Sequence, residues 1–157
     1  MDEKKYYLTP EGFQKYKEEY KDLKKLWKEK KTQLKESRDE IWRPEDLNPE
    51  FETLQTELDF IEGRIKNIEE VLKSAKVITN SGSSTGAKKV TIGTTVIVEV
   101  DGKIDEFTIV GTMEANPSEG KISNESPVGK MLMNRKVGDE IIITSPIKTV
   151  YKIKEIR

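Results

Sequence analysis

The sequence predicts an α+β fold, in which an antiparallel α-helical coiled-coil hairpin precedes a small domain of strands and one helix. Three observations predict this fold. Two long segments carry apolar residues at alternating spacings of three and four, a short acidic segment with two prolines separates them, and runs of β-branched residues fill the second half. We expect a coiled-coil domain over residues 1–78, a flexible linker over residues 79–87 and an α+β domain over residues 88–157.

The first helix is expected to begin at Thr9-Pro10. A threonine hydroxyl can cap free N–H groups, and proline at the first helical position has no N–H to leave unpaired. The apolar seam of this helix then continues at heptad spacing, although Lys30 and Ser37 take two of its positions. Its members are Phe13, Tyr16, Tyr20, Leu23, Trp27, Leu34 and Ile41.

The second helix has an unbroken seam, and it is expected to run antiparallel to the first. The seam consists of Phe51, Leu54, Leu58, Ile61, Ile65, Ile68 and Leu72. Pro44 and Pro49 disfavour helix in the residues before them, so the chain should reverse between about residues 38 and 48. At 1.5 Å per residue the hairpin would be roughly 40 Å long, with an acidic tip over residues 38–50.

The second half of the chain has the pattern of a small sheet domain. A linker of small residues over 79–86 precedes β-branched runs at Val90–Ile92 and Thr95–Val100, and Asp101-Gly102 is typical of a hairpin turn. Further strands are expected over residues 104–110, 140–144 and 150–156. Residues 126–134 open with Ser-Pro and carry apolar residues at helical spacing, which predicts one short helix.

Composition limits the possible chemistry. The chain has 157 residues, 36% of them charged, and it contains neither cysteine nor histidine. Disulfides, thiolate metal sites, cysteine nucleophiles and histidine bases are therefore excluded, so any chemistry must use carboxylates. The sequence shows no signal peptide and no apolar run long enough to span a membrane, and we expect a cytoplasmic protein with no membrane partner.

Charge is distributed unevenly along the predicted hairpin. Residues 1–35 hold 11 lysines and seven acids, a balance of +4, whereas residues 36–62 hold two arginines and ten acids, a balance of −8. The lysines of the first helix could line a nucleic-acid strand, or they could form a solvated face paired with glutamates, and the pattern alone favours the solvated face. The candidates for a nucleic-acid-proximal stripe are Lys24, Lys28, Lys31 and Lys35.

Several segments resemble the bacterial Gre transcript-cleavage factors, which are transcription elongation factors. Residues 123–129, Ser-Asn-Glu-Ser-Pro-Val-Gly, are similar to that family's S-x-x-S-P-hydrophobic-small segment, and Lys-Val-Gly-Asp at 136–139 is similar to the close of its C-terminal domain. Residues 8–12, 61–69 and 75–78 resemble the family's opening, second helix and exit from that helix. The similarity runs in order along nearly the whole chain.

The resemblance implies a partner and a mechanism. Such factors bind RNA polymerase through an FKBP-like C-terminal domain, here with Ser126, Pro127, Val128 and Gly129 as candidate docking residues. Their coiled coil enters the polymerase's secondary channel, where its tip helps to hold Mg²⁺ at the polymerase's own catalytic centre, and backtracked nascent RNA is hydrolysed. By this resemblance the chain would be a monomeric activator rather than an enzyme. It would have no cofactor of its own, and the free protein would bind no metal stably.

The tip departs from the family's pattern. The family loop reads approximately G-D-L-x-E-N-A-E-Y, and in this chain the two residues between the D-L pair and the N-A-E-Y segment are missing. Asp46 matches the first acid and is the leading candidate, followed by Glu45 and then by Glu50, Glu40 and Asp39. Alternatively, Asp46 only caps the second helix and Glu50 only complements the dipole of that helix.

Two other functions remain open from the sequence. The altered tip is compatible with a channel binder that inhibits or modulates polymerase without stimulating cleavage. An FKBP-like domain could also be a prolyl isomerase, although Phe107 and Tyr151 are the only aromatic residues in the second half and are too few to line the usual proline pocket.

Overall fold

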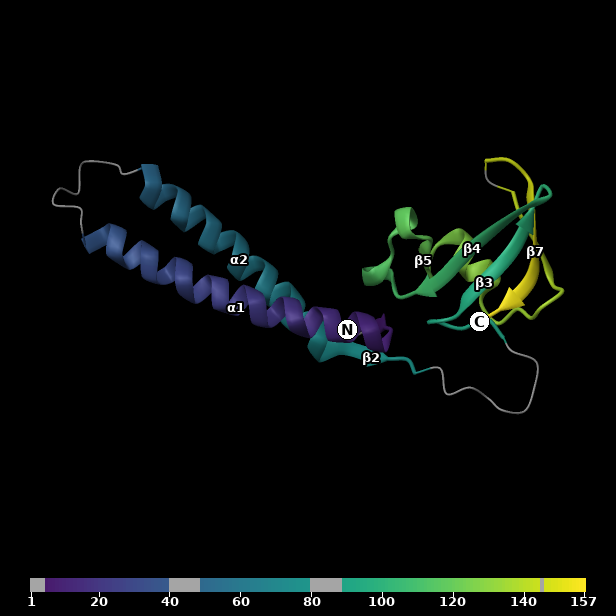
Figure 1. Cartoon of the computed structure of the whole chain (residues 1–157), viewed down its shortest axis with the longest axis horizontal. Coiled ribbons are helices and arrows are strands. Elements are labelled where there is room, and N and C mark those ends of the chain that lie inside the picture. Colours follow the sequence, from purple (N-terminus) through teal and green to yellow (C-terminus); the bar gives the residue numbers. More distant parts are fainter. Residues whose placement is uncertain (1–4, 40–48, 80–88, 145) are drawn as a thin grey trace. The chain divides into compact units, whose positions relative to one another are not determined.

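The structure is a computed structural model that describes residues 5–39, 49–79, 89–144 and 146–157. It confirms the predicted α+β class, with a helical hairpin followed in sequence by a β-sheet domain (Figure 1). The chain divides into two compact units, formed by Gln14–Ser74 and by Met1–Phe13 with Ala75–Arg157. The predicted linker over 79–87 lies almost wholly outside the described residues, so the predicted domain boundaries stay a prediction. None of the described helices could cross a membrane.

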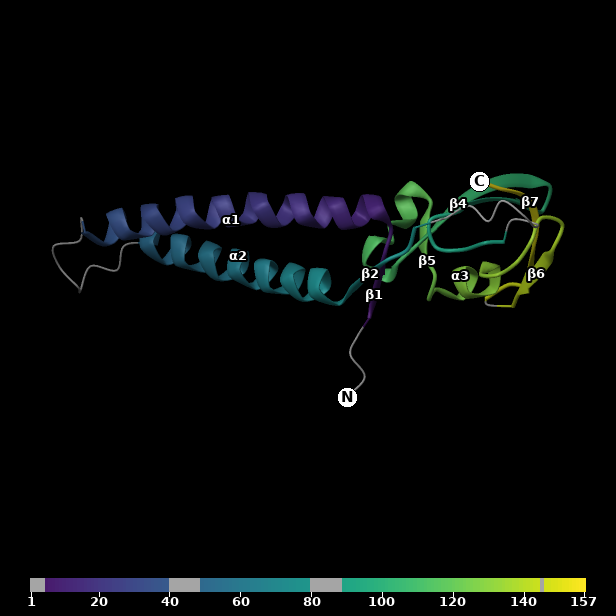
Figure 2. The same cartoon turned by 90° about the horizontal axis from the view of Figure 1, so that it is seen from below.

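The hairpin consists of α1 (Pro10–Asp39) and α2 (Pro49–Ser74), which lie antiparallel along one another (Figure 2). Thr9 caps α1 as predicted, since its hydroxyl accepts a hydrogen bond from the Gly12 N–H at 3.1 Å. The seam of α2 is buried from Leu54 to Ile68, but Val71 rather than the predicted Leu72 completes it.

The seam of α1 is half-buried, and polar atoms complete its packing against α2. The Tyr20 hydroxyl donates to Glu69 at 2.6 Å, and the Trp27 indole N–H donates to Glu62 at 2.9 Å. Lys30, which interrupts the apolar pattern, lies 2.6 Å from Glu57. The predicted seam residue Ile41 lies outside the described residues.

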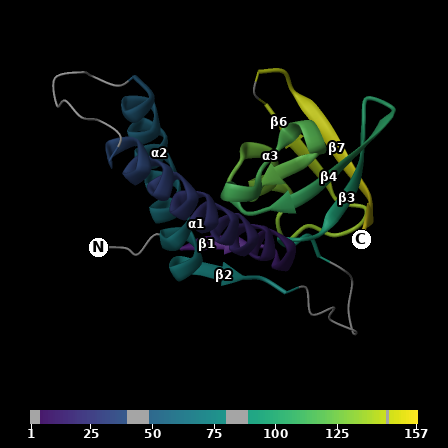
Figure 3. The same cartoon turned by 60° about the vertical axis from the view of Figure 1, so that its left-hand side comes forward.

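Two three-residue strands were not predicted. β1 (Tyr6–Leu8) precedes α1 and β2 (Ala75–Val77) follows α2, and the two strands pair in parallel (Figure 3). The backbone of β1 passes close to Gly111, where a Cβ atom would lie 1.6 Å from the Tyr7 carbonyl oxygen. Only glycine fits at that approach.

The main sheet has the strand order β5-β4-β3-β7-β6. The strands are β3 (Thr95–Val100), β4 (Lys103–Val110), β5 (Lys121–Ser123), β6 (Glu140–Ile143) and β7 (Thr149–Ile156), and the 3-10 turns η1 (Thr112–Glu114) and η2 (Pro117–Glu119) lie between β4 and β5. β4 pairs with β5 in parallel, and the other neighbouring strands are antiparallel. Asp101 and Gly102 have φ values of 49° and 78°, the pattern of a type I′ turn, which confirms the predicted β3–β4 hairpin.

The predicted strand at Val90–Ile92 is wrong. The hydroxyl of Thr94 accepts from the Thr91 N–H at 3.1 Å and donates to the Thr91 carbonyl at 2.7 Å, so this segment forms a local turn. Side-chain bonds of this kind compete with strand pairing. Val90 and Ile92 are nevertheless buried in the core.

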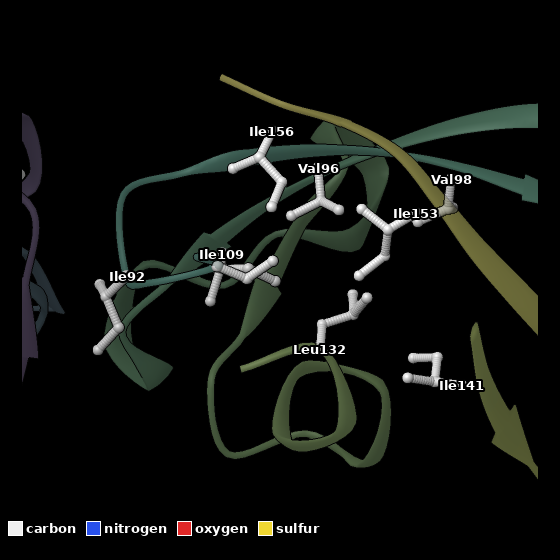
Figure 4. Packing of buried hydrophobic residues seen from close by; sticks show 9 residues of the cluster. Ile92, Val96, Val98, Ile109, Leu132, Ile141, Ile153 and Ile156 are labelled. Carbon is white, nitrogen blue, oxygen red and sulfur yellow. The ribbon is translucent and has the colours of Figure 1, made fainter. Parts of the chain in front are cut away.

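The core of the sheet domain lies between the sheet and α3 (Pro127–Leu132), the short helix expected within residues 126–134. Figure 4 shows Leu132 pointing from α3 toward Ile109 and Ile153 on the sheet. All three side chains are almost completely buried. The core therefore fixes α3, and with it the loop that leads into this helix.

Candidate functional site

The loop before α3 is built by Ser126. Its hydroxyl donates to the Ser123 carbonyl at 2.7 Å and accepts from the Gly129 N–H at 3.0 Å, which caps the helix, while Pro127 takes the first helical position. A Cβ atom at Gly129 would lie 1.9 Å from the Ser123 carbonyl oxygen. The Ser-Pro-x-Gly pattern is therefore explained by the geometry of this turn.

A second set of hydrogen bonds fixes the same loop from η1. The Ser123 hydroxyl lies 3.0 Å from the Thr112 hydroxyl and accepts from the Glu125 N–H at 3.0 Å. The Thr112 hydroxyl also donates to the Glu125 carboxylate at 2.9 Å. The loop is thus held in one shape by its own hydrogen bonds.

The predicted docking residues differ in what they present to solvent. Pro127 is exposed, Ser126 and Val128 are half-buried, and Gly129 is buried. Of the four, Pro127 is therefore the best placed to touch a partner, and the others shape the loop. The motif did not identify three neighbouring exposed side chains, Glu125, Lys130 and Met131.

The predicted lysine stripe is divided by its contacts within the hairpin. Lys24 lies 3.8 Å from Glu69 and 4.8 Å from the centre of the Tyr20 ring, and Lys31 lies 4.4 Å from the centre of the Trp27 ring. Lys28 and Lys35 are exposed, and neither has an ion pair with another residue in the described part of the chain. The solvated-face interpretation thus accounts for Lys24, while Lys28 and Lys35 keep their charge available.

Contacts among Tyr20, Lys24 and Glu69 shift the pKa values of Lys24 and Glu69. The hydrogen bond from Tyr20 lowers the pKa of Glu69 below its ordinary value, and Lys24 and Lys73 act in the same direction. The pKa of Lys24 is raised, chiefly by Tyr20 and further by Glu69. Both pKa shifts favour the charged forms of Lys24 and Glu69.

The structure describes the backbone of two of the five predicted tip carboxylates, Asp39 and Glu50. Glu40, Glu45 and Asp46 lie outside the described residues, and Asp39 is the last residue of α1. Glu50 is exposed in the first turn of α2, where an acid complements the helix dipole. Over the described ranges, no group of three or more acidic side chains is arranged to hold a metal ion. The metal-directed role of the tip stays a prediction.

A groove on the hairpin was not predicted. It has a volume of about 910 Å³ and is lined by side chains that include Leu26, Thr53 and Phe60. Phe60 falls outside the heptad seam and is 78% exposed. The sequence already indicated this exposure, because Phe60 is an apolar residue at a position that does not belong to the heptad seam.

The two aromatic residues considered for a proline pocket serve the core of the sheet domain. Phe107 and Tyr151 are half-buried, pack against the core and lie 6.5 Å apart between ring centres. Both rings therefore contribute to core packing in this domain.

Comparisons with known proteins agree with the two-part architecture. Residues 6–77 match the family model for the N-terminal domain of GreA/GreB transcription elongation factors, and residues 85–157 match the model for the C-terminal domain of the same family. The chain is 49% identical over 61 residues to transcription elongation factor GreA of Thermomicrobium roseum, which covers 39% of each chain. It is 42% identical over 87 residues to GreA of Mycoplasma genitalium, covering 54% of this chain and 53% of the relative.

The matched segments thus span about half of these relatives or less. Among solved structures, the crystal structure of GreA factor homolog 1 of Thermus thermophilus is 25% identical, with 98% of this chain and 99% of that chain covered and a TM-score of 0.46. Because the two family models match consecutive parts of the sequence, in the order hairpin and then sheet domain, the chain belongs to the GreA/GreB family of transcription elongation factors.

Proposed function

We propose that this chain binds RNA polymerase through the loop before α3 and carries acidic side chains into the polymerase's secondary channel on its helical hairpin. There it would stimulate the polymerase's own hydrolysis of backtracked RNA. The observation that carries the proposal is the match of both family domain models in one chain, in order. Two further features support the proposal. The loop before α3 is preformed and could bind the polymerase, and the coiled coil has an acidic end that could carry carboxylates into the channel.

The hairpin suits the role of a carrier. α1 has 30 residues and α2 has 26, so the paired helices are about 40 Å long at 1.5 Å per residue. Buried α2 side chains and the hydrogen bonds of Tyr20 and Trp27 hold the helices together along this length. A stiff hairpin can position a charge at its tip with less loss of conformational entropy than a flexible chain.

The chemistry would belong to the polymerase, with Mg²⁺ shared at its catalytic centre. Mg²⁺ keeps several waters and is bound through one or two carboxylates plus phosphate oxygens, so added tip carboxylates could complete the coordination of a second ion. In this role the chain's own residues supply negative charge and position. A protein without histidine can do both.

A second candidate function follows from the spacing of the tip. Two residues of the family's loop pattern are missing between Asp46-Leu47 and Asn48-Pro49. If the acids no longer meet the metal, the chain would occupy the channel and slow elongation without promoting cleavage.

One assay separates these functions. Purified polymerase is stalled in a backtracked complex with 3′-labelled RNA, and release of the labelled fragment is followed with and without the full chain. Faster release supports the cleavage function. Slower elongation with unchanged cleavage favours the modulator, and no effect on either reaction, with no binding, rejects both functions.

A further inference from the structure

The sheet domain contains a basic pocket, which we define as the concavity of about 450 Å³ lined by Lys89, Lys130, Arg135 and Lys136 together with Met131, Met133, Asn134 and Asp139. It lies at the C-terminal end of α3, and it continues the surface that begins at Pro127, because Lys130 and Met131 belong to the same helix. Within the described ranges, four cations and a single acid line the pocket.

Backbone hydrogen bonds hold two segments of the pocket together. Lys89 and Lys136 form an antiparallel bridge, the Val90 N–H donates to the Arg135 carbonyl at 2.8 Å, and the Asn134 N–H donates to the Val90 carbonyl at 2.9 Å. Val90 itself is completely buried in the core. The pocket's cations therefore project from a fixed backbone rather than from a loose loop.

The one acid of the pocket is already engaged. The Asp139 carboxylate accepts from the Lys136 N–H at 2.9 Å and closes the turn that contains Gly138, whose φ is 92°. Arg135 donates from Nε to the Met131 carbonyl at 3.2 Å, a contact that leaves its positive charge uncompensated. Asp139 therefore serves the backbone and leaves the pocket with an excess of positive charge.

The cations of the pocket differ from four others in the same domain. Across the described ranges, none of Lys89, Lys130, Arg135 and Lys136 has a carboxylate within ion-pair distance. Four other cations of this domain do have carboxylate partners, namely Lys121, Lys152, Lys154 and Arg157. Like charges gathered in one concavity repel one another, and an anionic ligand would relieve that repulsion.

The lining favours an acidic protein segment over a nucleic acid. Among the described residues, no aromatic side chain lines the pocket to stack on a base, whereas two methionines do line it. Methionine is unbranched and polarizable, so it adapts to apolar side chains of varied shape. Met131 is 38% exposed beside the cations, which suits a segment that alternates carboxylates with apolar residues.

We infer that the basic pocket binds an acidic segment on the surface of RNA polymerase, which extends the docking surface from Pro127 to Lys89 and Lys136. This inference rests on the proposed function, since it takes polymerase to be the partner. The bound segment would place two or more carboxylates opposite the lysines of the pocket and an apolar side chain against Met131.

The test compares two charge-neutralised variants of the full chain. Lys89→Gln with Lys136→Gln removes two pocket charges, and Lys103→Gln with Lys148→Gln removes two charges from exposed lysines of the same domain that do not line the pocket. Affinity for core polymerase is measured by competition against the labelled parent chain at several salt concentrations. The pocket variant should bind roughly 5- to 10-fold more weakly with a shallower salt dependence, and the control should stay within about 2-fold of the parent.

A second measurement tests ligand binding at the pocket in the absence of polymerase, and so does not depend on the proposed function. A synthetic Glu/Leu-alternating peptide is added to the full chain, and methyl NMR shifts of Met131 and Met133 are followed, with an RNA oligonucleotide of equal charge as the comparison. Shifts caused by the peptide, and lost in the pocket variant, support the inference. Preference for the RNA, absence of any shift, or equal weakening of polymerase binding in both variants would overturn it.

If the parent does not bind polymerase but the peptide still shifts these methyl signals, the proposed function fails and so does the assignment of the partner. The pocket then remains a site for acidic segments. If the parent binds polymerase and the peptide gives no shift, the proposed function stands and the inference about the pocket fails.

Discussion

Glu114 and Thr9 are joined by two hydrogen bonds. The Glu114 carboxylate accepts from the Thr9 backbone N–H at 2.7 Å and from the Thr9 hydroxyl at 2.5 Å. Thr9 in turn caps the first turn of α1, where a Cβ atom at Gly12 would lie 1.8 Å from the same carboxylate. An acid in η1 thus reinforces the start of a helix that begins more than a hundred residues earlier in the chain.

Removing this carboxylate should destabilise the protein. Glu114→Ala leaves the Thr9 N–H without its charged acceptor, and we expect a loss of about 1–2 kcal/mol in the free energy of unfolding, measured by urea denaturation. Thr9→Val and the double variant complete a cycle that isolates the pair. Strict additivity in this cycle, or an equal loss in the exposed control Asp105→Ala, would contradict the role assigned to Glu114.

The hairpin seam predicts a sharp contrast between two neighbouring positions. Leu58 is 7% exposed in the seam, so Leu58→Asp should bury an unpaired charge and reduce stability by several kcal/mol. Phe60→Asp is the matched control, because Phe60 is exposed on the same helix, and it should change stability by about 0.5 kcal/mol or less. Thermal melting followed by circular dichroism measures both. Similar melting temperatures for the two variants would show that the seam is assigned incorrectly.

The loop before α3 allows docking to be separated from folding. Pro127→Ala removes an exposed contact from a loop that other bonds hold in place, so polymerase affinity should fall by roughly 3- to 10-fold while the melting temperature hardly changes. Ser126→Ala should instead lower stability by about 1 kcal/mol through loss of the helix cap. Competition binding and thermal melting on the same samples distinguish the two effects. Unchanged affinity in Pro127→Ala would remove that residue from the docking surface.

The tip carboxylates predict a defect confined to the chemical step. Asp46→Asn removes a charge and nearly preserves shape, so polymerase binding should persist while cleavage of backtracked RNA slows by ~100-fold or more. Raising the Mg²⁺ concentration should partly restore the rate by mass action. Glu45→Gln, alone and combined with Asp46→Asn, tests the pair, with Glu50→Gln as the comparison at the start of α2. Variants that all cleave at the parental rate would assign the metal-directed role elsewhere.

Sequence reasoning succeeded where the signal is local. The heptad spacing identified α1 and α2, the Asp101-Gly102 turn identified the β3–β4 hairpin, and Ser126-Pro127 marked the start of α3. Each of these rests on a few neighbouring residues whose backbone preferences agree with the final fold. The Gre resemblance was likewise confirmed by the family models.

What could not be predicted depends on contacts between distant parts of the sequence. β1 and β2 have three residues each, which is too short for a periodic pattern to be detected. They pair with each other although the whole hairpin separates them in the sequence. The bonds from Thr9 to Glu114 join residues 105 positions apart. The basic pocket depends on the meeting of Lys89 with Lys136, and the local turn closed by Thr94 outweighed the β propensity of Val90–Ile92.

The parallel pairing of β1 with β2 brings the two ends of the hairpin together, with Tyr6 opposite Ala75. In topological terms the hairpin is an insertion within a discontinuous domain, whose two pieces are Met1–Phe13 and Ala75–Arg157. Adding or deleting one heptad in each helix would change the reach of the hairpin by about 10 Å and leave the contacts of that domain untouched. The length of the hairpin and the contacts of the sheet domain can therefore vary independently, by engineering or by evolution.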